Sequence, residues 1–305
     1  MRIRTLAEGL AFPEGPVALA DGSVLIVEIA DGSLTRVMPD GTNSPVARPG
    51  GGPNGAAIGP DGKCYICNNG GFKWHVEGRH RRPVMQADDY RGGRIERVDL
   101  STGAVECLYR AAGEVPLKGP NDLVFDRHGG FYFTDPGKVR AREMDRGAVY
   151  YARADGGAIG EVAFPLVTPN GVGISPDEKT LYVAETEPAR VWAFDIIEPG
   201  VVRKQPWPSP HGGRLVAGVG GYQRFDSLAV DAEGRICVAT LMSGGITVIA
   251  PNGRHFEHHP MPDPLTTNIC FGGPDLKTAF ITLSWTGRLV AVDWPTPGLR
   301  LNQPL

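Results

Sequence analysis

Two observations predict an all-β fold, a six-bladed β-propeller, for this chain. The first is composition: the 305 residues include 42 Gly and 27 Pro, yet 41% of the residues are hydrophobic. Gly and Pro are unfavourable inside helices and common in turns, so this composition favours many short strands around a sizeable core. The second is a pattern that recurs six times. Propellers of this size commonly form one unit, so we expect residues 1–305 to be a single domain.

Each copy of the pattern has a polar residue, a short apolar segment, a turn rich in Asp, Gly and Pro, and then a β-branched or aromatic strand. We call the polar residues the leader residues; they are Glu14, Asn54, Asn121, Asn170, Asp226 and Asn268. Each leader residue lies seven positions before the same place in its turn, as Asn170 does before Asp177. The copies start 40 to 67 residues apart, close to the length of a propeller blade with insertions.

The rest of each copy supplies the outer strands of a blade. After the turn, most copies continue into a third strand and a second turn, as in "GSLTRVMPDG" and "GITVIAPNG". Each copy therefore provides at least three strands. The N-terminal segment "MRIRTLAEGLAF" is expected to add the outer strand of the last blade and so close the ring.

The leader residues predict a cation site. In a propeller the first strand of each blade lines the central channel, so the leader residues should form a ring at the channel mouth. Carboxylates and carboxamides without Cys or His are the ligands of a hard cation, Ca²⁺ first and Mg²⁺ or Mn²⁺ next. Glu14 and Asp226 are the expected ligands because they neutralise its charge. The alternative is that the leader residues only cap strand starts through water and backbone hydrogen bonds.

The segments around the leader residues resemble a known family. "FPEGPVAL", "GPNDLVFDRHGGFYFTDP", "TPNGVGISPDEKTLYVAE", "FDSLAVDAEGRICVAT" and "TNICFGGPDLKTAFIT" are similar to segments of the gluconolactonase, senescence-marker-protein (regucalcin) and luciferin-regenerating-enzyme family. The similarity runs from about residue 10 to residue 290. It implies a propeller with one divalent cation, Ca²⁺ before Zn²⁺, Mn²⁺ or Mg²⁺. The implied metal ligands are Glu14, Asn170 and Asp226, and Asn121 would contact the substrate or a metal-bound water.

The resemblance implies a metal-dependent lactonase, which opens a cyclic ester. A divalent cation polarises the ester carbonyl, lowers the pKa of water and stabilises the developing oxyanion. Asp226 would act as general base as well as ligand, while Asn121 and Asn54 would orient the ester oxygens. One alternative hydrolyses another ester or a phosphotriester at the same site. A second is a non-enzymatic Ca²⁺-binding propeller module, because fold does not fix function.

Two departures from the family concern the substrate. Members carry an Arg two residues before the substrate-binding Asn, where this chain has Gly119 beside Lys118. An insertion over residues 70–93 carries Phe72, Trp74, His75 and Tyr90, which could roof the channel mouth. A solvated loop or a subunit contact is the alternative. The expected substrate-binding residues are Asn121, Asn54, Asn268, Trp74, His75 and Lys118.

The composition also limits which partners and which cellular location we expect for this protein. The 31 basic and 34 acidic residues include no basic block, which argues against nucleic acid. No stretch approaches eighteen apolar residues, so we expect no membrane span. The five cysteines are odd in number and scattered, which favours reduced thiols; "CYIC" at 64–67 resembles a metal or redox pair, but its thiols should face opposite sides of a strand. We expect a cytoplasmic monomer or small homo-oligomer whose partner is a small lactone.

Overall fold

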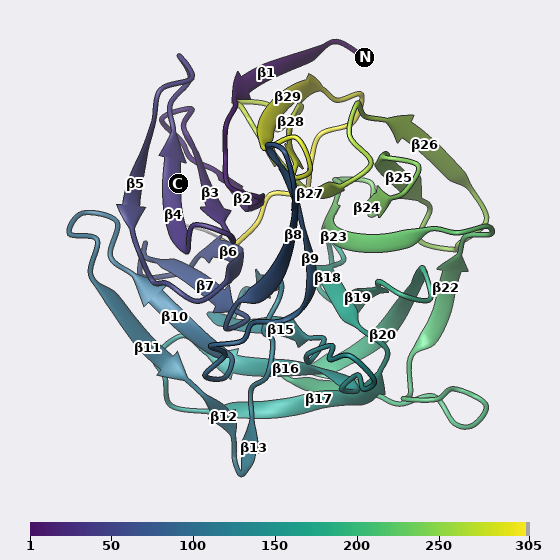
Figure 1. The fold of residues 1–305 in the computed structure, drawn as a ribbon. Helices are drawn as coiled ribbons and strands as arrows, with labels where there is room; N and C mark the ends of the chain where they lie inside the picture. The colour runs from purple at the N-terminus through teal and green to yellow at the C-terminus, as the bar shows by residue number, and fades with distance from the viewer. Residues whose placement is uncertain (303–305) are drawn as a thin grey trace.

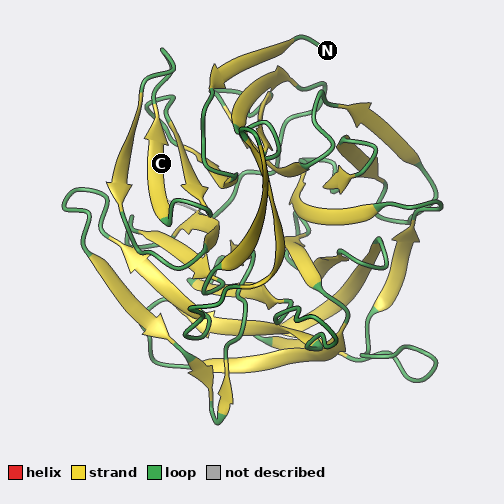
Figure 2. Ribbon diagram, viewed as in Figure 1, coloured by secondary structure: helices red, strands yellow, loops and turns green. Residues whose placement is uncertain are grey.

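The computed structural model describes residues 1–302 and forms six antiparallel sheets arranged radially around a central channel (Figure 1). Strands and loops account for all of these residues (Figure 2). Among them, therefore, none belongs to a helix long and apolar enough to cross a membrane. The predicted all-β six-bladed propeller is confirmed.

The blades follow the six copies of the sequence pattern. The first blade contains β2 (Pro13–Ala18), β3 (Val24–Glu28), β4 (Ser33–Val37) and β5 (Asn43–Ala47). The second contains β6 (Pro53–Ile58), β7 (Cys64–Asn68), β10 (Arg94–Val98) and β11 (Val105–Tyr109). The third contains β14 (Leu123–Phe125), β15 (Gly130–Asp135), β16 (Gly147–Arg153) and β17 (Ile159–Leu166). The fourth contains β18 (Pro169–Ile174), β19 (Thr180–Glu185) and β20 (Arg190–Glu198), and both β21 (Val201–Arg203) and β22 (Arg214–Gly218) pair with β20.

The last two blades complete the ring. The fifth contains β23 (Arg224–Val230), β24 (Ile236–Leu241), β25 (Gly245–Ile249) and β26 (Phe256–Pro260). The sixth contains β27 (Thr266–Gly272), β28 (Thr278–Leu283), β29 (Arg288–Asp293) and the N-terminal β1 (Ile3–Ala7). Ile3 lies opposite Val292 and Ala7 opposite Leu289. The N-terminal segment thus provides the predicted outer strand, which joins the two ends of the chain in one sheet.

Neighbouring blades pack through apolar side chains. Cys64 packs with Val17 between the first two blades, whereas Cys67 packs with Phe131 between the second and third. The two thiols therefore point to opposite faces of β7, as the strand period predicts. All five cysteines are free.

The leader residues sit at irregularities in the innermost strands. Strand pairing shifts register at the leader residue in five blades, for example between Pro169 and Val172 in β18 and between Phe225 and Leu228 in β23. Such β-bulges re-aim side chains. They release Asn170 and Asp226 from the regular strand pairing.

A glycine after the leader residue allows the inner strands to approach closely. A Cβ atom on Gly171 would lie 2.6 Å from the backbone nitrogen of Leu228 and 2.7 Å from the backbone carbonyl oxygen of Asp226. Real Cβ atoms do not tolerate such distances from backbone atoms, so only glycine fits. Gly171 thereby brings β18 against β23, and with it Asn170 near Asp226.

The insertion after β7 forms a hairpin of β8 (Phe72–Glu77) and β9 (His80–Gln86). Figure 1 shows this hairpin crossing in front of the channel towards β28 and β29. A second, short hairpin joins β12 (Ala111–Ala112) to β13 (Val115–Pro116).

Candidate active site

A cavity of about 500 Å³ lies at the channel mouth beneath the β8–β9 hairpin. Five leader residues line it: Glu14, Asn54, Asn121, Asn170 and Asp226. They come from the first five blades, so only the closed ring brings them together. A concave pocket with converging polar groups is the usual form of a small-molecule site.

Glu14 supplies a buried carboxylate at the start of β2. The Gly15 backbone N–H donates to its Oε2 at 2.9 Å, and Asn268 Nδ2 donates to the same oxygen at 2.8 Å. Burial raises the pKa of Glu14 to about 7 because the charged form loses its hydration, and the hydrogen bonds oppose part of this rise.

Asp226 and Asn170 lie side by side on β23 and β18. Burial raises the pKa of Asp226 well above its usual value, the negative charge of Glu14 adds to the rise, and a hydrogen bond from the Asn170 side chain opposes it. Asn170 Nδ2 also donates to Thr186 Oγ1 at 3.1 Å. Two carboxylates thus share one site that destabilises their charged forms.

Asn121 presents an unpartnered oxygen to this site. Its side chain is buried, and Oδ1 has no hydrogen-bond partner among residues 1–302. A buried polar atom without a partner costs about 1–3 kcal/mol. Such an atom marks a place where a ligand, a water or a cation completes the structure.

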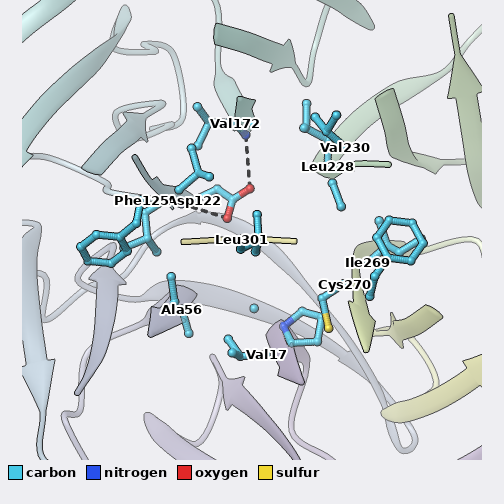
Figure 3. A pocket seen from close by; sticks show the side chains of 18 of the residues that line it. Val17, Ala56, Asp122, Phe125, Val172, Leu228, Val230, Ile269, Cys270 and Leu301 are labelled. Atoms are coloured by element: carbon cyan, nitrogen blue, oxygen red, sulfur yellow. Dashed lines mark hydrogen bonds between the residues drawn. The ribbon is translucent and has the colours of Figure 1, made fainter. Parts of the chain in front are cut away.

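Asp122 is a third buried carboxylate that the sequence pattern did not single out. It accepts hydrogen bonds from the Leu123 backbone N–H at 3.0 Å and the Val172 backbone N–H at 3.3 Å. Burial and, secondly, the charge of Glu14 raise its pKa to about 8. Its carboxylate lies in a second cavity of the channel, among apolar side chains such as Val172 and Leu301 (Figure 3). The only sequence signal for it was its place next to a leader residue.

The donor set fits a hard divalent cation. Within residues 1–302, no group of three or more His, Cys, Asp and Glu side chains is arranged to hold a metal ion. The available donors are instead the carboxylates of Glu14 and Asp226 with the amide oxygens of Asn170 and Asn121. Oxygen donors of this kind suit Ca²⁺ or Mg²⁺, whose charge would offset the repulsion between the carboxylates.

The other expected substrate residues lie in different places. Asn54 lines the pocket, whereas Asn268 lies behind Glu14 and fixes its orientation. Trp74 packs against Phe12 with ring centroids 5.1 Å apart. His75 is exposed on β8 and is not among the residues that line the pocket. The Lys118 side chain pairs with Asp145 at 2.7 Å.

Position 119 cannot carry a side chain in this fold. A Cβ atom on Gly119 would lie 2.5 Å from the Gly137 carbonyl oxygen. The arginine that the family resemblance implies there is therefore excluded by the backbone of the next loop. The pocket instead has Arg82 from β9 and Arg224, which pairs with Glu187. Arg224 precedes the leader residue Asp226 by two positions. The repeat places this position beside the channel mouth, so the sequence could have indicated Arg224 as a pocket residue.

Comparisons with known proteins agree with this geometry. Residues 12–284 match the SMP-30/gluconolactonase/LRE-like region. A protein named lactonase drp35 from Staphylococcus saprophyticus is 28% identical over 260 residues, which cover 84% of this chain and 69% of that protein. The gluconolactonase of Zymomonas mobilis is 26% identical over 310 residues, covering 92% and 79% respectively.

The fold is also shared with solved structures. The crystal structure of regucalcin, a calcium-binding protein from Agrobacterium tumefaciens, matches with a TM-score of 0.75 at 19% identity, and the match covers 98% of each chain. At this identity the likeness concerns the fold. Because the family region spans residues 12–284, nearly the whole chain, this protein belongs to the SMP-30/gluconolactonase/LRE-like family, as its motifs predicted.

Proposed function

We propose that this protein is a divalent-metal-dependent hydrolase that opens a lactone. The observation that carries the proposal is the unpartnered Oδ1 of Asn121 in one pocket with two carboxylates, the buried Glu14 and the half-buried Asp226. The lactonase and gluconolactonase names of two relatives support the same reaction class.

Glu14, Asn170 and Asp226 would hold the cation, with Ca²⁺ the first choice and Zn²⁺, Mn²⁺ or Mg²⁺ as alternatives. When bound, such a cation polarises a carbonyl, lowers the pKa of a coordinated water and stabilises an oxyanion. Asn268 keeps the Glu14 carboxylate in place through its Nδ2 hydrogen bond, and Thr186 does the same for Asn170.

The remaining pocket residues would act on the substrate and the attacking water. Asp226 accepts the proton that the water loses as it attacks the carbonyl carbon. Asn121 and Asn54, which line the same pocket, orient the ester oxygens by donating hydrogen bonds from their Nδ2 groups. The proton is then available for the alkoxide that leaves when the ring C–O bond breaks, giving the hydroxy acid.

A cation and substrate screen tests this function. The metal-stripped protein is assayed against sugar, aliphatic and aromatic lactones, an aryl ester and a phosphotriester, with Ca²⁺, Mg²⁺, Mn²⁺ and Zn²⁺ added back singly. We expect lactone turnover that depends on the added cation. Turnover of the aryl ester or phosphotriester alone would contradict the lactonase assignment, and cation binding without any turnover would favour a binding module.

The proposal also concerns where the protein works. A lactone is the small-molecule partner, and five free cysteines suit a reducing compartment such as the cytoplasm.

A further inference from the structure

The β8–β9 hairpin is anchored at its base on the third blade. Lys138, which is buried, donates from Nζ to the carbonyl oxygens of Asn69 and Gly71, both at 2.8 Å. Its Nζ also lies 4.3 Å from the centre of the Phe72 ring, a cation–π contact. The other strand is tied by the Gln86 backbone N–H, which donates to the Val139 carbonyl at 2.9 Å. Both ends of the hairpin are therefore fixed.

The tip of the hairpin is anchored on the opposite side of the mouth. His80 stacks on Trp285 of the sixth blade, with ring centroids 5.0 Å apart and planes inclined by 7°. His80 Nδ1 also lies 3.0 Å from the Trp285 carbonyl oxygen. The hairpin thus spans the channel mouth from the third blade to the sixth (Figure 1), and a substrate must fit beneath it.

The underside of this hairpin is largely apolar. Phe72, Pro83, Val84 and Met85 line the pocket from above, and Arg82 is the one charged residue that the hairpin adds to this lining. Apolar side chains from three other blades line its sides: Phe12, Ile29, Leu241, Met242 and Leu265. The five leader residues that line the pocket form its floor. The pocket is therefore polar at the leader residues and beside Glu187 and Arg224, and mainly apolar along the hairpin and along the first, fifth and sixth blades.

Two of the apolar wall residues are held in a strained backbone conformation. Phe12 has φ 61° and Met242 has φ 73°, in the left-handed region that favours glycine. Large side chains in such a conformation persist only where their surroundings hold them, and they concentrate at functional sites. Trp74 supports Phe12 from the hairpin side. The strain is consistent with a need for apolar side chains at these two positions.

We propose that the hairpin and these wall residues form an apolar subsite that selects lactones bearing an alkyl or aryl substituent over polyhydroxylated sugar lactones. The proposal rests on the proposed lactonase function. An alkyl chain placed against Pro83, Val84 and Met85 is removed from water, which is favourable. Sugar hydroxyls placed against these three side chains would lose their water without gaining side-chain hydrogen-bond partners there, which is unfavourable.

The test uses three lactones with the same ring: δ-valerolactone, δ-decalactone, which adds a pentyl chain, and glucono-δ-lactone, which adds hydroxyls. We expect the full-length protein with its active cation to show a kcat/KM for δ-decalactone about tenfold or more above the other two, from burial of the added methylenes. A preference for glucono-δ-lactone would overturn the subsite. Cation-dependent turnover without any preference would overturn it while leaving the proposed function intact, whereas no lactone turnover would overturn both.

Matched variants test which residues cause the preference for δ-decalactone. The double variant Val84→Ser, Met85→Ser should reduce the ratio of kcat/KM between δ-decalactone and δ-valerolactone by about tenfold. Val76→Ser, on the same hairpin but exposed and outside the pocket, should leave the ratio unchanged. An equal loss on both substrates in the double variant would contradict a subsite for the substituent.

A second pair tests the strained wall without disturbing the backbone. Met242→Gly keeps a conformation that glycine adopts readily and removes only the side chain, so the ratio should fall by about threefold or more. Leu276→Gly is the control, because Leu276 has a similar φ of 57° in the turn after β27, away from the mouth. An unchanged kcat/KM ratio in Met242→Gly would show that the Met242 side chain does not contribute to the subsite.

Discussion

The two ends of the central channel are built from the same six strands and have opposite chemistry. At the mouth, the strand starts carry Glu14, Asn170 and Asp226, which form the polar floor of an open pocket. At the far end, the same strands carry Val17, Val172 and Val230, which line an apolar cavity that Leu301 also contacts (Figure 3). The position along each strand, rather than the choice of strand, therefore decides the chemistry.

The bulges explain how one strand serves both ends. In β18 the register shifts between Pro169 and Val172. Asn170 therefore has no regular pairing partner on β19, whereas Val172 and Ile174 do. Asp122 lies between the two environments, with its carboxylate bonded to the Val172 backbone N–H. The comparison predicts large catalytic effects at the mouth, structural effects at the strand contacts and small effects at the far end.

The largest effect is expected for Asp226→Ala at the mouth. Asp226 is the proposed proton acceptor and a proposed cation ligand, so its loss should lower kcat/KM by about 10³-fold or more. Metal content measured by mass spectrometry after dialysis should fall with it. Asp275→Ala, at an exposed turn of the far end, is the control. Wild-type turnover in Asp226→Ala would refute the proposed mechanism.

Asn121→Ala should have the next largest effect. The Asn121 amide is proposed to orient the ester oxygens, so removing it should lower kcat/KM by about 10²-fold, while the cation is expected to stay bound through the other proposed ligands. Metal content and steady-state kinetics measured on the same preparation separate the two quantities. Asn252→Ala, in an exposed hairpin turn, should change neither. Parallel loss of metal and activity would instead make Asn121 a cation ligand.

Gly171→Ala tests the strand contact that brings Asn170 near Asp226. The added Cβ would meet backbone atoms of β23 at 2.6 and 2.7 Å, so the strands must separate. We expect the free energy of unfolding to fall by about 1–3 kcal/mol, measured by denaturant titration. Gly160→Ala, where a Cβ atom would meet nothing within 4 Å, is the matched control. Equal stability of the two variants would show that the close approach is dispensable.

The smallest effect is expected at the far end, for Leu301→Ala. Its side chain contacts the apolar cavity but is 47% exposed. Its truncation should therefore change the free energy of unfolding by under about 1 kcal/mol and leave kcat/KM unchanged. A clear drop in lactone turnover would show instead that the two ends of the channel are coupled.

The repeat in the sequence was sufficient to predict the fold and the ring of leader residues. The fixed offset between leader residue and turn distinguished Asn170 from Asn252, although both lie in a Pro-Asn-Gly triplet. In the structure, Asn252 lies in the turn between β25 and β26, and Asn170 lines the pocket. A period along the chain is a local property, and so the sequence displays it directly.

The sequence could not predict which of the polar side chains face the pocket. Asn268 has the same register as the other leader residues, but it bonds to Glu14 and does not line the cavity. The sequence indicated an insertion over residues 70–93. It could not show that Phe72 and Met85 of this insertion line the pocket while His75 does not. These outcomes depend on the twist of each strand and on contacts between distant segments.

The sequence by itself determined the number of blades, the closing strand and the oxygen-rich character of the channel mouth, because repeated patterns and turn residues act over short distances. Only the tertiary structure decided that Lys138 and Trp285 anchor the hairpin over the mouth, that Asp122 joins the buried carboxylates and that Gly119 must lack a side chain. Each of these depends on backbone atoms brought together from different blades, and closure of the ring sets those distances.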